Sequence, residues 1–274
     1  MSRIDKIFQQ IKSEDRAALT MYLTVGFPDF KTSAVIARAA IEAGVDIIEL
    51  GVPYSDPLAD GKTIQNASNI ALANGINLNH CLDLTRQIRG YAPDIPIVLM
   101  GYFNPFLQYG LDILAKNSVI AGVDGFIIPD LPPEESETID RYLIENRLDL
   151  IYLLAPTSTE KRIQQVVNKT RAFIYCVSVA GVTGARDNIS SEGVKLVEKV
   201  KTLSSSPVAL GFGISTPEQV QNASKIADAV IVGSAFVDLI SDNIDKELIG
   251  SVTGYIETLA NSLSKNTSVS ENNE

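Results

Sequence analysis

Short apolar runs alternate along the chain with longer segments in which apolar residues recur at every third or fourth position. Runs of the first kind, rich in Val, Ile and Leu, predict strands, and segments of the second kind predict amphipathic helices. Strands are predicted at residues 18–25, 46–51, 95–101, 125–129, 148–154, 172–177, 207–211 and 229–232. Helices are predicted at residues 30–43, 63–74, 78–91, 105–121, 133–146, 160–169, 191–203 and 217–225.

The strict alternation of eight strands with helices predicts parallel βα units. The strands are almost wholly apolar, which is typical of a sheet covered on both faces. Such units form either a closed barrel or an open, doubly wound sheet. The length of 274 residues and the lack of Lys or Pro in the middle of any predicted strand favour closure. We therefore predict a single-domain α/β fold, a (β/α)8 TIM barrel with extra helices over residues 1–263, and a polar, disordered tail at residues 264–274.

One turn between a helix and a strand occurs three times. AGVDIIELG at residues 43–51 and AGVDGFIIPD at residues 121–130 both pass from a glycine through Val-Asp into a strand, and KIADAVIVGS at residues 225–234 is a looser version. Glycine commonly ends a helix in the left-handed conformation. The Asp then stands at the amino-terminal end of the strand. The repeated unit is one βα turn, which does not indicate a solenoid.

The composition excludes several classes of protein. A formal charge of −10 argues against a nucleic-acid footprint. Two cysteines, Cys81 and Cys176, fit a reducing compartment, and Cys176 in the run FIYCVSV is predicted to be a packed core thiol. No apolar run is long enough to span a membrane, and residues 1–16 lack the features of a signal peptide. We expect a cytoplasmic protein, or one of the plastid stroma.

Active groups of a (β/α)8 barrel lie at the carboxyl ends of its strands. The segment ELGVPYSDPLADGKTIQ at residues 49–65 begins at such an end, and strand alternation places Glu49 on one face with Val45 and Ile47. If that face points inward, desolvation raises the pKa of Glu49 and makes it a usable acid or base near neutral pH. The long following loop carries Asp60. The alternative is that Glu49 pairs with a basic group and that Asp60 only caps the next helix.

Glycine-containing stretches follow the last three predicted strands: VAGVTGAR at 179–186, GFGIS at 211–215 and VGSAF at 232–236. Backbone N–H groups at glycines and at a helix start bind phosphate well, and loops after the last strands of this fold commonly do so. Ser234 adds a hydroxyl group at the start of its helix. Ordinary βα turns also use glycine, but three such stretches at consecutive strands favour a phosphate site. The first stretch, with Thr183, is a candidate lid.

Aromatic residues gather near several strand ends. The segment MGYFNPF at 100–106, with Tyr22 and Tyr175, could line a pocket for a flat aromatic group, or it could be ordinary core packing. The only histidine, His80, falls in a predicted helix, no residues have the spacing of a metal site, and no lysine stands at a strand end as a Schiff base would require. Carboxylates are the acid and base that remain.

Six stretches together carry a resemblance to a known family: LTVGFPD, DIIELGVPYSDPLADG, MGYFNP, PDLPPEE, SVAGVTGAR and GFGIS. From about residue 4 to about residue 263 the chain resembles the tryptophan synthase alpha subunit. The resemblance implies a retro-aldol cleavage of indole-3-glycerol phosphate to indole and glyceraldehyde 3-phosphate, without a cofactor. It implies that Glu49 is the principal acid–base residue and that Asp60 accepts the indole N–H.

The same resemblance implies a set of substrate-binding residues. They are Ile64, Tyr102, Tyr175, Thr183, Gly184, Gly211, Phe212, Gly213, Gly233 and Ser234. It also implies a partner, a pyridoxal-phosphate β subunit in an α2β2 complex, which receives the indole through a tunnel. The implied partner-facing residues are Pro53, Asp56, Asn104 and Pro132. One departure is Val179-Ala180, where some members of the family carry a basic residue ahead of the glycine turn.

Two other functions fit parts of the pattern. An isomerase or synthase acting on a sugar phosphate or prenyl phosphate would explain the glycine stretches, but it leaves the long loop and the pair Glu49 and Asp60 without a role. A catalytically silent subunit that activates a β partner would show no lyase turnover of its own.

Overall fold

The computed structural model describes residues 1–177, 190–244 and 247–264. Its strands form one parallel sheet in the order β5-β4-β3-β2-β1-β9-β8-β7-β6. The strands are β1 (Ala18–Thr24), β2 (Ile47–Gly51), β3 (Ile97–Met100), β4 (Gly125–Ile127), β5 (Asp149–Ile151), β6 (Leu153–Leu154), β7 (Ile174–Val177), β8 (Val208–Gly211) and β9 (Ala229–Val232).

The two outer members of that order, β5 and β6, are parts of one predicted strand. Only Tyr152 separates them, β5 pairs with β4, and β6 pairs with β7. The N–H of Tyr175 also donates to the carbonyl of Tyr152 at 3.1 Å, so the sheet closes on itself at this residue. The closed (β/α)8 barrel is confirmed, and the open doubly wound sheet is wrong.

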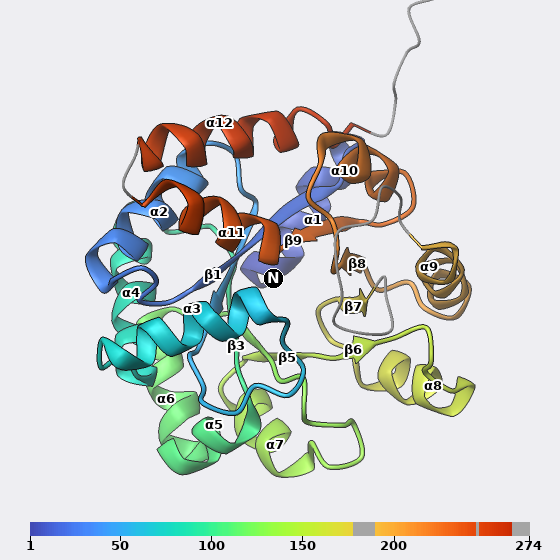
Figure 1. Ribbon diagram of the computed structural model, residues 1–274. Coiled ribbons are helices and arrows are strands. Elements are labelled where there is room, and N and C mark those ends of the chain that lie inside the picture. The colour runs from blue at the N-terminus through green and yellow to red at the C-terminus, as the bar shows by residue number, and fades with distance from the viewer. Residues whose placement is uncertain (178–189, 245–246, 265–274) are drawn as a thin grey trace, which may run out of the picture.

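Helices surround the barrel (Figure 1). They are α1 (Arg3–Ser13), α2 (Phe30–Glu42), α3 (Lys62–Ala73), α4 (Leu78–Tyr91), α5 (Phe103–Tyr109), α6 (Leu111–Ala121), α7 (Glu137–Glu145), α8 (Glu160–Lys169), α9 (Ser191–Leu203), α10 (Pro217–Ser224), α11 (Ser234–Asn243) and α12 (Leu248–Ala260). The single helix predicted at 105–121 is wrong, because Gly110, at φ 90°, divides α5 from α6. Helix α7 begins later than predicted, after turns at Leu131 and Glu135.

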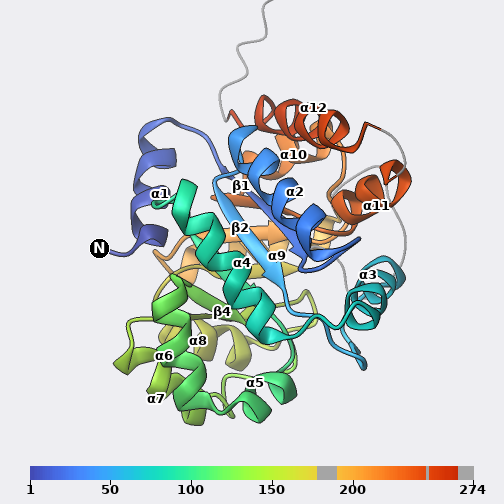
Figure 2. The same ribbon diagram turned by 90° about the vertical axis from the view of Figure 1, so that its left-hand side faces the viewer.

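Helix α1 closes the amino-terminal end of the barrel. It lies behind the strands in Figure 1 and at the opposite end of the molecule from α3 and α11 in Figure 2. Its apolar face buries Ile4, Phe8 and Ile11, and the Phe8 ring lies 5.6 Å from the ring of Phe173. Ser2 caps the helix by accepting the N–H of Asp5 at 3.0 Å, which satisfies a donor that the helix start leaves free.

The repeated turn noted in the sequence forms the same pair of hydrogen bonds three times, and each pair is called an Asp clamp below. In each copy the N–H of the Asp donates to the carbonyl of a residue in the preceding strand, and its carboxylate accepts the N–H of that same residue. The pairs are Asp46 with Leu19, Asp124 with Ile97, and Asp228 with Val208, all at 2.8–2.9 Å. Two bonds fix the register of neighbouring strands at their amino-terminal ends, which explains why an Asp recurs there.

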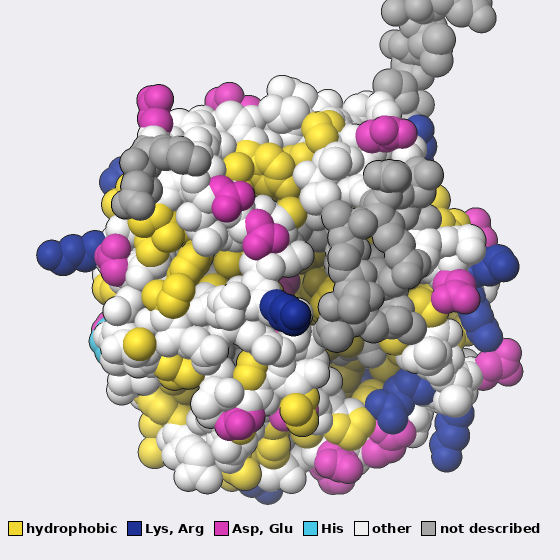
Figure 3. Space-filling model, viewed as in Figure 1, with side chains coloured by type: hydrophobic (Ala, Val, Ile, Leu, Met, Phe, Trp, Pro, Cys, Tyr) yellow, Lys and Arg dark blue, Asp and Glu magenta, His cyan; other side chains and the backbone are white. Residues whose placement is uncertain are grey.

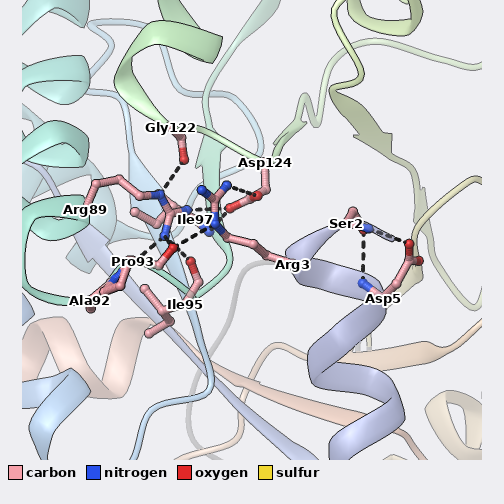
Figure 4. A network of polar contacts seen from close by, with 10 residues as sticks. All are labelled: Ser2, Arg3, Asp5, Arg89, Ala92, Pro93, Ile95, Ile97, Gly122 and Asp124. Atoms are coloured by element: carbon pink, nitrogen blue, oxygen red, sulfur yellow. Dashed lines mark hydrogen bonds and ion pairs between the residues drawn. The ribbon is translucent and has the colours of Figure 1, made fainter.

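Basic side chains complete these clamps, and Asp124 has the most extensive set (Figure 4). Its carboxylate accepts Arg3 at 3.0 Å and Arg89 at 2.6 Å. Arg89 also donates to the carbonyl groups of Gly122 and Ile95, so one guanidinium ties three segments together. Burial lowers the pKa of Arg89 to about 10.

The chain beyond α12 returns to the same end. Ser264, predicted to begin the tail, forms an isolated antiparallel bridge with Arg16, and residues 265–274 lie outside the described residues. Within the described ranges, no helix has the length and apolar character that a membrane crossing requires.

The Asp124 clamp generates a test of stability. Asp124→Ala removes the carboxylate that Arg89 binds, and the Arg89 side chain is only 12% exposed. It also removes the side-chain acceptor of the Ile97 N–H. We expect the free energy of unfolding in urea to fall by about 3 kcal/mol. Asp112→Ala is the control, since its ion pair with Lys116 is exposed on α6 and should leave the unfolding midpoint unchanged. Equal midpoints for both variants would contradict the role of the clamp.

Candidate active site

Glu49 lies inside the barrel near the carboxyl end of β2. The residue is 1% exposed and lies on the same face of β2 as Gly51, against which the end of the Tyr22 side chain packs. Its Oε2 atom is buried without a hydrogen-bond partner among the described residues. Burial, with a smaller contribution from Asp60, raises the pKa of Glu49 to about 8. The alternative, in which Glu49 pairs with a basic side chain, is not seen in this part of the structure.

Asp60 lies in the loop between β2 and α3, close enough to Glu49 to act on its charge. Burial raises the pKa of Asp60 to about 6, and a hydrogen bond from Tyr102 opposes that change. The residue before α3 is Gly61, and no side chain caps this helix. Asp60 therefore does not cap α3, and its carboxylate is free to face the barrel mouth.

Tyr102 supports the loop that carries Asp60. Its hydroxyl accepts the N–H of Ala59 at 2.9 Å and donates to Asp60. Tyr102 itself immediately precedes α5, whose first N–H, that of Phe103, donates to the carboxylate of Asp130 at 2.9 Å. The position of Asp60 thus depends on the loop after β3 and on the loop after β4.

The backbone at the ends of β8 and β9 is a candidate anion cradle. Directly after β8, Phe212 and Gly213 both have positive φ, 72° and 77°. Gly233 precedes α11, and its first residue is Ser234. Among the described residues no side chain caps this helix, and a helix start of this kind is suited to an anion.

Tyr175 and Gly211 fit together beside this cradle. A Cβ atom built on Gly211 would lie 2.6 Å from the Tyr175 hydroxyl oxygen, so only glycine leaves room for the ring. The rings of Tyr175 and Phe212 then meet edge to face at 6.0 Å. Ile64, on α3, is half-buried against the core. Thr183 and Gly184 lie outside the described residues.

The geometry matches a known family over nearly the whole chain. The family model of the tryptophan synthase alpha chain matches residues 8–265. A tryptophan synthase alpha chain of Dehalococcoides mccartyi is 48% identical over 263 residues, which are 96% of this chain and 100% of that protein. One of Roseiflexus sp. (strain RS-1) is 44% identical over 259 residues, 94% of this chain and 99% of that protein.

The chain belongs to the tryptophan synthase alpha chain family. Solved structures agree. Tryptophan synthase of Mycobacterium tuberculosis gives a TM-score of 0.89 at 38% identity, covering 96% of this chain and 98% of that chain. The alpha subunit of Legionella pneumophila str. Paris gives 0.88 at 33% identity, again covering 96% and 98%. Membership makes the chain a lyase and implies a β subunit as its partner.

The four predicted partner-facing residues differ in exposure. Asp56 and Asn104 are exposed, Pro132 is half-buried beside a cavity of about 210 Å³, and Pro53 is buried. Figure 3 shows this end of the molecule, on which hydrophobic side chains are exposed among charges of both signs. Leu58, in the same loop as Asp56, is 94% exposed, and a large apolar side chain in that position suits a contact surface.

Other predicted features have structural roles. His80 lies in the first turn of α4, where its ring interacts with Asn77. Cys81 and Cys176 are both buried, which confirms the core thiol predicted at Cys176. The described part of the chain holds no group of His, Cys, Asp and Glu that could bind a metal ion.

Sequence reasoning did not assign two residues that the structure places at the site. Asp130 supports Tyr102 through the start of α5, a contact between segments 27 residues apart that no local pattern reveals. Tyr22 pairs in register with Glu49. The sequence predicts Tyr22 only as a possible pocket lining, although its place two residues before the end of β1 is itself the mark of a site residue in this fold.

The raised pKa of Glu49 generates a test of stability against pH. The carboxyl group keeps its proton to about pH 8 in the folded chain and ionises near its ordinary 4.5 when unfolded. The folded state therefore binds more protons between these values, and its stability falls as pH rises through them. Glutamine does not ionise, so we expect the melting temperature of Glu49→Gln minus that of the wild type to increase as the pH is raised from about 5 to about 9.

Differential scanning calorimetry measures this gain, and Glu145→Gln, the same change on the exposed face of α7, is the control. A difference between Glu49→Gln and wild type that stays constant with pH would show that the Glu49 carboxyl is not desolvated.

Proposed function

We propose that this chain cleaves indole-3-glycerol phosphate into indole and glyceraldehyde 3-phosphate by acid–base catalysis. One feature carries the proposal: the buried Glu49 carboxyl has an oxygen without a hydrogen-bond partner in the described part of the chain, and burial raises its pKa to about 8. A carboxyl group with such a pKa can give and take a proton near neutral pH. Membership of the tryptophan synthase alpha chain family supports the lyase over an isomerase or synthase on another barrel.

The two carboxyl groups divide the work because their pKa values differ. Near pH 7 Glu49, with a pKa of about 8, is mostly protonated, and Asp60, at about 6, is mostly ionised. Glu49 donates its proton to the ring carbon that carries the glycerol chain, and ionised Asp60 accepts the indole N–H and stabilises the positive charge on the ring. Glu49 then takes the proton of the adjacent hydroxyl group. The carbon–carbon bond breaks, its electrons return to the ring, and the oxygen becomes the aldehyde.

The phosphate group anchors the other end of the substrate. The backbone at Gly213 and the start of α11 at Gly233 and Ser234 would supply N–H donors without requiring a basic side chain. This explains how a chain of net charge −10 binds an anionic ester. Binding energy gained at the phosphate holds the ring against Glu49.

The exposed part of the loop after β2 supports a partner on this face. Asp56 and Leu58 precede Asp60 in that loop by a few residues, so a β subunit bound there would act directly on the position of Asp60. The family leads us to an α2β2 complex in which pyridoxal phosphate belongs to the β subunit and this chain has no cofactor. The isolated chain should then be the weaker catalyst.

Glu49→Gln tests the acid–base role. Glutamine keeps the size of the side chain and loses the exchangeable proton, so indole release with a β subunit present should fall by far more than tenfold, a barrier rise well above ~1.4 kcal/mol. Binding of indole-3-propanol phosphate, which lacks the chain hydroxyl groups, should survive. A variant that keeps over about a tenth of wild-type turnover would remove the role. A wild type that releases no indole would favour the silent activating subunit.

Gly213→Asp tests the phosphate site. The substitution brings a negative charge to the cradle, and Gly213→Ala is its control because both side chains strain the positive φ of 77°. We expect Asp to weaken the affinity for indole-3-propanol phosphate about tenfold more than Ala, or ~1.4 kcal/mol, in calorimetric titration. Equal affinities of the two variants would place the phosphate elsewhere.

A further inference from the structure

Tyr22 lies between the two halves of the site. Its residue is 8% exposed on β1, next in register to Glu49 on β2, and its neighbour Met21 pairs with Val232, the residue before Gly233. A Cβ atom built on Gly233 would lie 3.7 Å from the Tyr22 Cβ. The side chain therefore starts beside the phosphate cradle.

The other end of the Tyr22 side chain lies beside the carboxyl groups. A Cβ atom built on Gly51 would lie 2.1 Å from the Tyr22 hydroxyl oxygen, so the ring end rests directly on this glycine. Gly51 follows Glu49 by two residues on the same face of β2. Both Asp60 and Glu49 act on the Tyr22 hydroxyl electrostatically. The ring thus runs from the cradle to the carboxyl groups.

In the function proposed above, the phosphate binds at Gly233 and the indole at Glu49 and Asp60. The three-carbon chain that joins them would then pass over the Tyr22 ring. That chain carries two hydroxyl groups, and the one next to the scissile bond lies at the carboxylate end, where the Tyr22 hydroxyl also lies.

The Tyr22 hydroxyl is prepared to donate a hydrogen bond. Thr24 Oγ1 donates to its oxygen at 3.3 Å, and the hydrogen bonds of the described residues include none that Tyr22 donates. Burial and the nearby carboxyl groups raise the pKa of Tyr22, so the hydroxyl keeps its hydrogen at every working pH. Its hydrogen is therefore available to an acceptor on a ligand.

We propose that Tyr22 contacts the substrate and donates a hydrogen bond to the hydroxyl oxygen next to the bond that breaks. This inference rests on the function proposed above. The oxygen gains negative charge as Glu49 removes its proton, and a fixed donor at that point stabilises the charge. Tyr22 also makes the site selective for a hydroxylated chain, because an unpaired buried hydroxyl disfavours a chain without that oxygen.

Tyr22→Phe tests the proposal, since it removes one oxygen and keeps the ring. We expect kcat/KM for indole-3-glycerol phosphate, measured with the β subunit, to fall about tenfold. The affinity for indole-3-propanol phosphate, which lacks that oxygen, should not fall, because Tyr22→Phe also removes the hydroxyl that this ligand leaves unpaired. Tyr91→Phe is the matched control: it also removes a buried hydroxyl without a partner among the described residues, at the end of α4, and should leave kcat/KM unchanged.

Each other outcome overturns the proposal. Equal losses for both ligands would mean that the hydroxyl only supports the packing of the site, and no loss for either would mean that it does not reach the substrate. A shifted pH midpoint of kcat would mean that it acts on Glu49 instead. Failure of the proposed function is separate, because the wild type would then release no indole even with the β subunit.

Discussion

Burial of the Glu49 carboxyl in the barrel disfavours its ionised form, and the chemistry open to the site depends on this effect. The walls near the group are apolar strands and the rings of Tyr22 and Tyr175, so few dipoles are available to stabilise a negative charge. A second carboxyl group, Asp60, adds repulsion. The proton therefore stays on Glu49 at pH values at which exposed carboxyl groups are ionised, which is the property that the proposed acid requires.

The two ends of the barrel are built from different types of residue. At the amino-terminal end, Asp carboxylates accept hydrogen bonds from neighbouring strands. Guanidinium groups such as that of Arg89 donate to the same carboxylates, and α1 covers the opening. At the carboxyl end, glycines such as Gly51 and Gly211 make room for rings, and Gly213 adopts a backbone conformation that other residues avoid. Paired polar groups stabilise the first end, whereas the second end carries the buried Glu49 carboxyl, whose Oε2 has no hydrogen-bond partner among the described residues.

The strands and the barrel follow from the sequence because burial on both faces makes each strand a short, almost wholly apolar run. The alternation of side chains along a strand then predicts which face carries Glu49. The features that the sequence does not predict depend on contacts between segments far apart in the chain. The apolar pattern continues through Tyr152, so nothing local marks the seam between β5 and β6. It also continues through Gly110, whose positive φ divides two helices. The bond from Phe103 to Asp130 belongs to two loops and has no local signature at all.

The amino-terminal helix has a consequence for the order in which the molecule assembles. Although α1 is synthesised before every other described helix and strand, its apolar face packs against Phe173, and its Arg3 bonds to Asp124, 121 residues further on. Strand β1 likewise requires β9, which is made last of the strands, as its neighbour. During synthesis the first helix therefore has no place to dock until well over half of the chain has emerged, and its exposed apolar face needs protection until then.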